Sequence, residues 1–452
     1  MVERRRRLEE DGGPDGRPLA RQVARLSLQA LPVLAAEPLY VLVDTAVVGR
    51  LGAVALAGLA VAGVLFAQVT TALNFLSYGT TARSARLHGA GDRAKAVTEG
   101  VQATWVAIAV GVLVLVVGQI VARPVANALG DGGAVADAAV GWLRTALFGA
   151  PLILVTLAGN GWMRGVQDTA RPLRYVLAGN GLSAVLCPVF VHVLGWGLEG
   201  SAIANVIAQV IVASLFLSAI ARERRTHPEV SLRPDLGVIR AQLTMGRDLV
   251  LRTAGFQICF LSATAVAARF GPASVAAHQV VLQLWNFQSL VLDAVAIAAQ
   301  ALVGAALGAN GADRAKAIAA QVTRYGLWMG LVFGVLFAAL AGVLPHVFTG
   351  DPAVLAAVPA AWWFFVAMQP VAGVVFAIDG VLLGAGDAAF LRTTTLVAAL
   401  AGFLPLIWIS LAAGWGLVGI WTGLSVFMLV RLVAVLLRTR SGRWAVTGAP
   451  AA

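Results

Sequence analysis

The stretch Gly195-Trp196-Gly197-Leu198-Glu199-Gly200 returns in the second half of the chain as Gly414-Trp415-Gly416-Leu417-Val418-Gly419. The offset from Gly195 to Gly414 also relates two further segments, Arg50-Leu51-Gly52 to Arg269-Phe270-Gly271, and Asn160-Gly161 with Gly165 and Asp168 to Asp379-Gly380 with Gly384 and Asp387. A fourth segment, Gly91–Ala96, returns as Ala312–Ala317 after a small insertion, and this pair contains both lysines of the chain. Agreement across four separated segments indicates an internal duplication.

Around these segments the chain is very apolar. Hydrophobic residues make up 59% of its 452 residues, only 12% are charged, and the mean hydropathy is +0.85. A soluble core could not absorb so much apolar surface, so the composition indicates an all-α membrane protein that crosses the bilayer many times. The apolar runs predict twelve transmembrane helices, at roughly 26–48, 54–82, 98–122, 134–161, 172–194, 199–221, 249–269, 272–304, 318–343, 354–383, 391–413 and 415–438.

Polar stretches divide this chain into lobes. We expect a disordered cytosolic tail (1–25), an N-lobe of helices 1–6 (26–221), a cytosolic linker (222–248), a C-lobe of helices 7–12 (249–438) and a cytosolic C-terminal tail (439–452). Each lobe holds an even number of spans, so both enter the membrane in the same direction. The halves should therefore be parallel repeats, an arrangement used by secondary transporters.

The basic residues set the expected orientation. Of the 33 Lys and Arg residues, 28 fall in the tails and even-numbered loops, and Arg50, Arg123 and Arg269 fall on the opposite side. Only Arg144 and Arg324 are assigned to spans. The positive-inside rule then places both termini in the cytosol of a multi-pass inner-membrane protein. The net charge of +11 thus reflects topology, and no nucleic-acid partner is expected.

Four acidic residues fall inside the predicted spans, where a carboxylate is costly and a functional role is the first hypothesis. Asp44 and Glu37 lie about 10 Å apart on one face of helix 1, and Pro38 between them predicts a bend. Burial disfavours a charged carboxyl group, which would let Asp44 bind a proton near neutral pH. Either acid could instead be a static buried carboxyl group, and Glu37 could lie near the periplasmic or cleft surface.

The remaining polar candidates surround these acids. Asp293 is a second titrating site or a counter-charge for a substrate, whereas Asp379, near the cytosolic loop, is expected to be structural. Several intramembrane amides in one half suggest a hydrated pocket, although a single such amide usually joins helices. They are Asn74, Asn160, Asn180 and Asn205.

The sequence contains no motif that supports an enzymatic function. Gly89-Ala90-Gly91-Asp92 and Gly384-Ala385-Gly386-Asp387 resemble the aspartyl motif of intramembrane proteases, but both lie at loops with basic neighbours. The chain has no Walker A, His-Glu-x-x-His or Gly-x-Ser-x-Gly sequence, so its energy must come from an ion gradient. Cys187 and Cys259 lie in apolar runs and are expected to be buried small hydrophobic residues. We therefore expect no cofactor, metal or catalytic residue.

Three segments resemble the multidrug and toxic compound extrusion (MATE) family, and most closely its DNA-damage-inducible protein F (DinF-like) branch. They are Glu37-Pro38-Leu39-Tyr40-Val41-Leu42-Val43-Asp44-Thr45-Ala46-Val47-Val48-Gly49-Arg50-Leu51-Gly52, the loop Arg164–Thr169, and the helix 8 run Leu292–Gly304. The resemblance covers about residues 25–440. It implies a V-shaped pair of six-helix lobes that exports organic, often cationic, compounds in exchange for H⁺ or Na⁺.

The resemblance also implies site residues. Asp44 matches the family's cation or proton site, Asn160 and Asn180 match amides around it, and helix 1 bends on protonation, which makes Pro38 the hinge. Cys187 stands where the family often has Asn or Asp before the helix 5 proline, so that ligand is missing. Helix 7 also lacks the glutamate that other branches use for sodium, and fewer carboxylates favour H⁺.

These observations predict a proton-coupled multidrug antiporter of the inner membrane that acts as a monomer on small cationic or amphipathic compounds and contacts membrane lipid. A sodium-coupled exporter is the nearest alternative. A flippase for lipid-linked precursors is disfavoured, because it should show a basic cavity and the spans were assigned only Arg144 and Arg324. A membrane enzyme or scaffold is the remaining class.

Overall fold

The computed structural model describes residues 19–130 and 133–448, and these residues form helices joined by short turns, without a strand among them. Eleven described helices are long and apolar enough to cross a membrane. A further pair, α6 (Gly133–Leu147) and α7 (Ala150–Gly165), is bent by 48° and makes a twelfth candidate span if it is counted as one. The expected all-α membrane fold is confirmed.

The chain divides into two compact units. One comprises residues 28–246, and the other comprises residues 19–27 with 247–448. The first unit contains most of α2 (Leu19–Gly49) and, in order, α3 (Ala53–Leu73), α4 (Phe75–Gly89), α5 (Arg93–Gly130), α6, α7, α8 (Ala170–Pro188), the π-helical segment η1 (Val189–Val193) and α9 (Gly197–Thr226).

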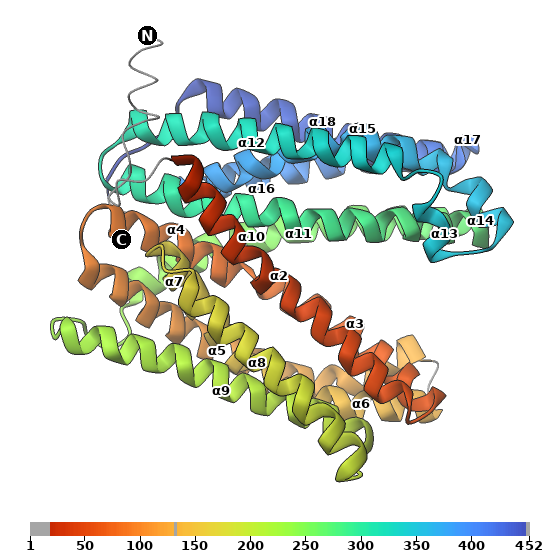
Figure 1. Cartoon of the computed structure of the whole chain (residues 1–452), viewed down its shortest axis with the longest axis horizontal. Helices are drawn as coiled ribbons and strands as arrows, with labels where there is room; N and C mark the ends of the chain where they lie inside the picture. The colour runs from red at the N-terminus through yellow and green to blue at the C-terminus, as the bar shows by residue number, and fades with distance from the viewer. Residues whose placement is uncertain (1–18, 131–132, 449–452) are drawn as a thin grey trace. The chain divides into compact units, whose positions relative to one another are not determined.

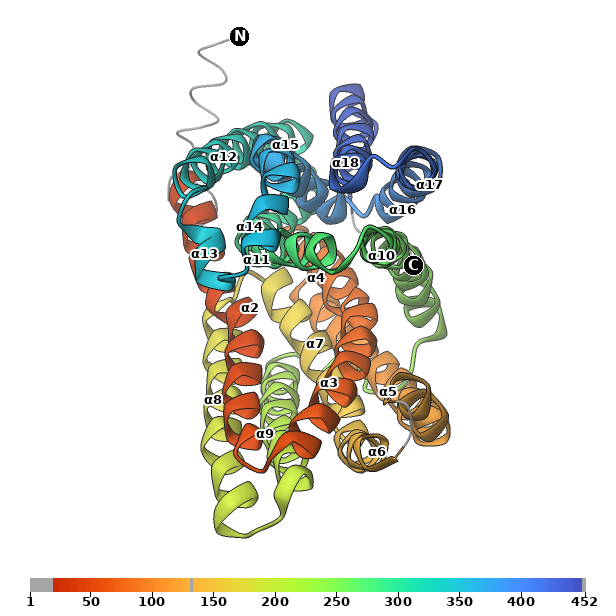
Figure 2. The ribbon, with the colours of Figure 1, turned by 90° about the vertical axis from the view of Figure 1, so that its right-hand side faces the viewer.

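The second unit contains most of α10 and all the later helices (Figures 1 and 2). In order, these are α10 (Leu236–Arg269), α11 (Pro272–Gly308), α12 (Ala312–Ala339), α13 (Leu344–Phe348), α14 (Pro352–Ala357), α15 (Pro359–Gly384), α16 (Ala388–Val397), the π-helical segment η2 (Ala398–Phe403), α17 (Leu404–Ala413) and α18 (Gly416–Ser441). Figure 1 shows α12, α15 and α18 running alongside one another.

The helices extend further than the apolar runs. The segment expected as a linker, 222–248, is non-helical only at 227–235, because α9 continues to Thr226 and α10 begins at Leu236. Helix α2 likewise begins at Leu19, ahead of the predicted start at 26. Hydropathy marks only the part of a helix that lies in lipid, and charged residues continue the same helix into water. Residues 1–18 and 449–452 of the expected tails lie outside the described residues.

The duplication is visible as equivalent contacts inside each unit. A Cβ added at Gly161 would lie 2.4 Å from the Ser77 carbonyl oxygen, and one at its repeat counterpart Gly380 would lie 2.3 Å from that of Ala296. Ser77 and Ala296 are related by the same sequence offset as the two glycines. Small residues let membrane helices approach closely. The pairs α4–α7 and α11–α15 are therefore packed by the same rule.

Candidate functional site

The Asp44 carboxyl group is the centre of a buried polar cluster in the first unit. Asp44 lies on α2 and is only 4% exposed. The Cys187 thiol on α8 donates to its Oδ1 at 3.2 Å. The Ser201 hydroxyl on α9 is placed to donate to the same carboxyl group, and it accepts a hydrogen bond from Trp142 Nε1 at 2.8 Å. Three helices thus meet at one acid.

A second layer of this cluster lies about one helical turn away. Tyr40 on α2 is buried, and Ser183 of α8 and Asn205 of α9 lie beside its hydroxyl group. The hydroxyl groups of Tyr40 and Ser183 nevertheless make no hydrogen bond of regular geometry. A buried hydroxyl group that is poorly hydrogen-bonded costs free energy. These hydroxyl groups therefore keep hydrogen-bonding capacity next to the acid.

The sequence held a signal for this cluster that the search for isolated acids and amides missed. Its members form pairs four residues apart on three helices, Tyr40 with Asp44, Ser183 with Cys187, and Ser201 with Asn205. Residues at this spacing lie on one face of a helix, one turn apart. Cys187 was expected to be a buried hydrophobic residue that left a ligand missing. It is buried, and its thiol donates a hydrogen bond to the Asp44 carboxyl group.

The helix that carries Cys187 changes its geometry at this point. Helix α8 ends at Pro188 and continues as the π-helical segment η1. The His192 ring nitrogen Nε2 in η1 lies 3.1 Å from the Val47 carbonyl oxygen of α2. π-Helical turns are rare and often occur at functional sites. Here the turn joins α8 to the helix that holds the acid.

The expected amides lie elsewhere. Asn160 on α7 is buried, and its Oδ1 has no hydrogen-bond partner. Asn180 is half-buried and donates to the Val176 carbonyl oxygen of its own helix at 3.1 Å. Among the described residues, no hydrogen bond links either amide to Asp44. Only Asn205 of the expected amides joins the cluster, through Tyr40.

The remaining predicted residues occupy varied positions. Asn74 is exposed where α3 gives way to α4, and Pro38 is exposed within the continuous helix α2. Asp293 is half-buried on α11 in the second unit. The Glu37 side chain lies outside the described residues, so its predicted role stays a prediction.

A second buried acid, Asp379 on α15, is held by two arginines. Arg252 of α10 donates to its Oδ2 at 2.6 Å, and Arg431 of α18 donates to the same oxygen at 2.5 Å. The Arg431 guanidinium is 1% exposed and lies 4.7 Å from the centroid of the Phe256 ring. An anion between two cations leaves this cluster with one excess positive charge. Such a tethered arrangement fits the structural role expected for Asp379.

This triad corrects the assignment of the basic residues. Arg252 and Arg431 were counted among the cytosolic loops and tail, and only Arg144 and Arg324 were placed in spans. Instead, both lie within membrane helices α10 and α18, with Arg431 fully buried. The position of these arginines near the ends of predicted spans could not reveal this. Their counter-charge, Asp379, lies 127 positions from Arg252 and 52 positions from Arg431 in the sequence.

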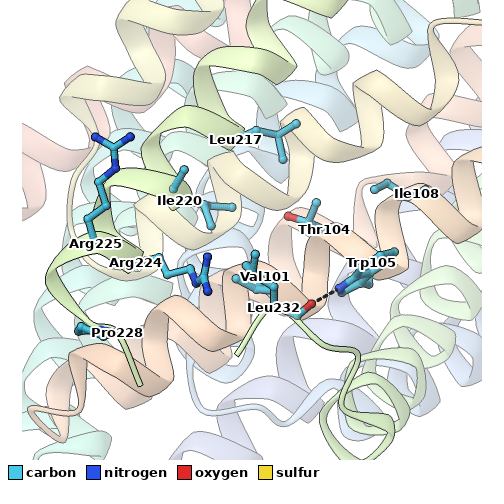
Figure 3. Close-up of a pocket in the computed structure, with 11 residues that line it drawn as sticks. Val101, Thr104, Trp105, Ile108, Leu217, Ile220, Arg224, Arg225, Pro228 and Leu232 are labelled. Carbon is cyan, nitrogen blue, oxygen red and sulfur yellow. Dashed lines mark hydrogen bonds between the residues drawn. The ribbon is translucent and has the colours of Figure 1, made fainter. Parts of the chain in front are cut away.

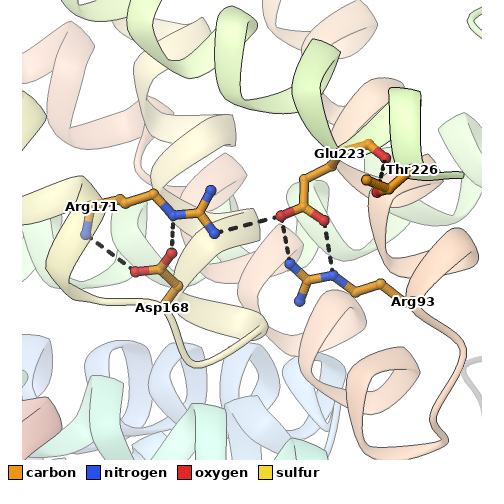
Figure 4. Close-up of polar contacts among 5 residues, drawn as sticks. All are labelled: Arg93, Asp168, Arg171, Glu223 and Thr226. Carbon is orange, nitrogen blue, oxygen red and sulfur yellow. Dashed lines mark hydrogen bonds and ion pairs between the residues drawn. The ribbon is translucent and has the colours of Figure 1, made fainter.

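Ion pairs also join three helices at the arginine-rich end of the first unit (Figure 4). Glu223 of α9 accepts from Arg93 of α5 at 2.8 Å and lies 3.5 Å from Arg171 of α8. Arg171 also pairs with Asp168 of the Arg164–Thr169 loop. At the nearby turn, the hydrogen bond from the Lys95 side chain, with one from its backbone N–H, holds the pKa of Asp92 below its usual range. These contacts fix loop geometry and leave the Asp44 cluster as the candidate site.

In the described part of the chain, no three His, Cys, Asp or Glu side chains gather in a group that could hold a metal ion. The Asp44 cluster itself offers a carboxyl group, a thiol and hydroxyl groups, which can exchange protons and bind polar groups.

Comparison with known proteins gives concordant matches. The family model described as MatE matches residues 32–189 and 249–408. The chain is 33% identical to "Protein DETOXIFICATION 44, chloroplastic" of Arabidopsis thaliana, over 94% of this chain and 83% of that one. It is 30% identical to "DNA damage-inducible protein F" of Escherichia coli (strain K12), over 92% of both. A solved structure described as "Crystal structure of MATE in the bent conformation" superposes with a TM-score of 0.86 at 21% identity, covering 97% of this chain and 96% of the other.

Proposed function

Because this chain belongs to the MatE family of membrane transporters, as its helix 1, loop and helix 8 motifs predicted, we propose that it exports small organic compounds in exchange for protons. Family membership makes it a transporter of the multidrug efflux class and not an enzyme. The proton as coupling ion, the cationic or amphipathic substrates and the inner-membrane location with cytosolic termini are the parts we propose.

The observation that carries the proposal is the Asp44 cluster. Its carboxyl group is buried, and the partners around it are a thiol and hydroxyl groups. A carboxyl group held this way can alternate between a charged form that accepts these hydrogen bonds and a neutral form that no longer needs them. Proton binding from outside neutralises Asp44, α2 bends at Pro38, and the substrate leaves outward. Release of the proton to the cytosol resets the cycle.

The same cluster disfavours sodium. Hard cations such as Na⁺ are held by several oxygen ligands, with carboxylates as the strongest of them. The Asp44 carboxyl group is bonded by a soft thiol. The buried carboxylate of Asp379 already pairs with the guanidinium groups of Arg252 and Arg431, which provide the positive counter-charge that a cation would otherwise supply. Sodium-coupled export remains the second candidate. The proposal favours protons because a thiol bonds the Asp44 carboxyl group and two guanidinium groups already pair with Asp379.

A flippase for lipid-linked precursors remains a weaker candidate, although the spans contain more arginines than the sequence predicted. The membrane helices do carry the half-buried Arg252 and the buried Arg431, but Asp379 binds both of them. They do not form the unpaired basic surface that a pyrophosphate needs. Export by a monomer that needs no cofactor is part of the same proposal.

The proposal is tested with Asp44→Asn in inverted vesicles, which keeps the side-chain volume but removes the titrating group. We expect the variant to lose substrate-induced proton release and export, while Glu223→Gln, outside the cluster, retains both. The assay is run with and without Na⁺. Undiminished proton coupling in Asp44→Asn contradicts the role of Asp44, and export that requires Na⁺ in the wild type selects the sodium-coupled alternative.

A further inference from the structure

A groove of about 650 Å³ opens on the first unit between α5 and α9 (Figure 3). It lies at the end of the unit that carries the Arg93, Arg171 and Glu223 ion pairs, and it is separate from the Asp44 cluster. One wall comes from α5 with Val101, Thr104, Trp105 and Ile108, and the other from α9 with Leu217 and Ile220. Its rim holds Arg224, Arg225 and Pro228.

The apolar walls of the groove continue along the outside of the two helices. Ile108 is exposed, and farther along α5 Val112 and Leu113 are exposed as well. On α9, Leu217 is followed toward the middle of the helix by exposed Val210. Exposed apolar residues on membrane-spanning helices face acyl chains, because water is absent there. The groove is therefore one end of a lipid-facing surface.

The charged end of the groove is positive. Arg224 points toward Val101 and Leu232, and its Nε donates to the Val230 carbonyl oxygen at 3.3 Å (Figure 3). Arg225 stands exposed at the rim. None of the eleven residues that line the groove is acidic. The excess positive charge of two guanidinium groups outweighs the partial negative charge at the end of α9.

The acidic residue next to Arg224, Glu223, pairs with arginines outside the groove. Glu223 sits between the groove arginines and Arg222 in the sequence, but its carboxylate is bound by Arg93 at 2.8 Å and lies 3.5 Å from Arg171 (Figure 4). Because α9 is helical there, Glu223 and the groove arginines project in different directions. The charge of Arg224 and Arg225 is thus left for a ligand at the groove.

The floor of the groove is fixed before any ligand arrives. Trp105 Nε1 donates to the Leu232 carbonyl oxygen at 2.8 Å. Gln102 donates to the Arg233 carbonyl oxygen and accepts from the Asp235 N–H, both at 2.9 Å. These bonds hold the segment 227–235 against α5. A site that is already ordered loses less entropy on binding, and tryptophan at this position is typical of the membrane interface.

We propose that this groove binds one anionic phospholipid of the leaflet on the arginine-rich side. Its phosphate lies at Arg224, with the charge of Arg225 at the rim beside it, and an acyl chain follows Ile108 and Leu217 toward the middle of the bilayer. Arginine suits phosphate because its planar guanidinium group offers paired donors. The apolar walls require the acyl chain as well, so a free phosphate ion would satisfy only one end of the site.

The test is native mass spectrometry of the full chain in detergent with equal amounts of phosphatidylglycerol and phosphatidylcholine that carry identical acyl chains. We expect the wild type to retain phosphatidylglycerol over phosphatidylcholine by about tenfold. The double variant R224Q/R225Q loses this preference. The matched control R174Q/R222Q removes two exposed arginines from the same end but outside the groove, and keeps it.

A further variant tests the apolar wall of the groove without changing its charge. Leu217→Trp fills the apolar wall without removing an arginine, and we expect it to release the retained phosphatidylglycerol. If R224Q/R225Q does not fold, Leu217→Trp still tests whether the lipid binds in the groove. Equal loss of preference in both double variants, retention in Leu217→Trp, or displacement of the lipid by inorganic phosphate at the same concentration overturns the proposal.

Discussion

At the residue scale, the chemistry of the candidate site depends on how the charged form of Asp44 is held. The thiol of Cys187 donates at 3.2 Å, and it is the contact that joins α8 to this acid. A thiol is a weak donor, whereas a hydroxyl group is a stronger one. The side chain at this position should therefore tune the ease with which Asp44 changes its charge.

Replacing Cys187 tests this contact. Cys187→Ala removes the donor and leaves a buried carboxylate less well bonded, so we expect export to fall by about three- to tenfold. Cys187→Ser supplies a hydroxyl group and should retain export. Initial rates of substrate efflux from cells that express each variant at equal levels provide the measurement. Cys259→Ala, which removes an equally buried thiol far from Asp44 in sequence, is the control. Equal rates for Cys187→Ala and the wild type would exclude a role for the thiol.

The triad at Asp379 makes a prediction about stability. Asp379→Asn leaves the buried Arg431 and the half-buried Arg252 without a counter-charge and should destabilise the chain by about 3–5 kcal/mol. Arg431→Met keeps a one-to-one pair between Asp379 and Arg252, so it should cost less. Thermal unfolding of the purified variants measures the difference. A larger loss in Arg431→Met than in Asp379→Asn contradicts the charge argument, and combining both substitutions should recover part of the loss seen in Asp379→Asn.

At the scale of elements, glycines fix how closely the helices pack. Gly326 of α12 and Gly373 of α15 face each other, and a Cβ at Gly373 would lie 2.0 Å from the Gly326 carbonyl oxygen. That contact is to backbone, so the helices would have to separate. This contact is specific to the second unit, whereas the contacts of Gly161 and Gly380 recur at equivalent positions of the two units.

We therefore expect Gly373→Ala to lower the free energy of unfolding by about 1–3 kcal/mol through overpacking. Gly181→Ala on α8 is the matched control, because an added Cβ there meets nothing within 4 Å. In a helix, alanine at such an open position should be neutral or stabilising by up to about 1 kcal/mol. Melting temperatures of the two variants under identical detergent conditions provide the comparison. A stable Gly373→Ala with a destabilised Gly181→Ala would reverse the expected order.

Prolines and π-helical turns, which interrupt regular α-helical geometry, also belong to the scale of elements. The prolines of α2 were evident in the sequence, and the structure keeps α2 as one helix through Pro32 and Pro38. The π-helical segments η1 and η2 are each flanked by a proline, Pro188 before η1 and Pro405 after η2, but a proline by itself does not predict a π-helical turn. One extra residue per turn depends on what the helix packs against, so local propensity does not reveal it.

At the scale of the whole molecule, the uneven distribution of basic residues sets the expected orientation in the membrane. Lys95 lies at the start of α5, on the side expected to face the cytosol, and His346 lies in α13, in a loop that the predicted topology assigns to the other side of the membrane. Both side chains are exposed, and the native cysteines are buried. These positions suit labelling with a reagent that cannot cross the membrane.

In intact cells, a membrane-impermeant maleimide should label His346→Cys but not Lys95→Cys. Permeabilised cells should show labelling of both, since the barrier is then removed. The wild type, with only its two buried cysteines, is the control for background labelling. Labelling of Lys95→Cys in intact cells would place the arginine-rich loops outside and contradict the orientation.

The sequence by itself determined the class and the plan of this protein. Its apolar runs predicted the helices, the constant offset between repeated segments predicted the duplication, and the motif around Asp44 predicted the family. These properties are written in local composition and spacing, so they need no knowledge of which helices touch. The scarcity of acids within spans also singled out Asp44 and Asp379, together with Glu37 and Asp293.

Only the tertiary structure decided what each of these acids contacts. Asp44 meets Cys187 from 143 residues away, and Asp379 is bound by Arg252 and Arg431 from other helices. The expected partners Asn160 and Asn180 are on helices too, but their rotation points them elsewhere. A side chain's partner depends on the angles and rotations of packed helices, and these are set by many weak contacts summed over the whole unit. For that reason the same kind of residue is a candidate proton site in one unit and a bound ion pair in the other.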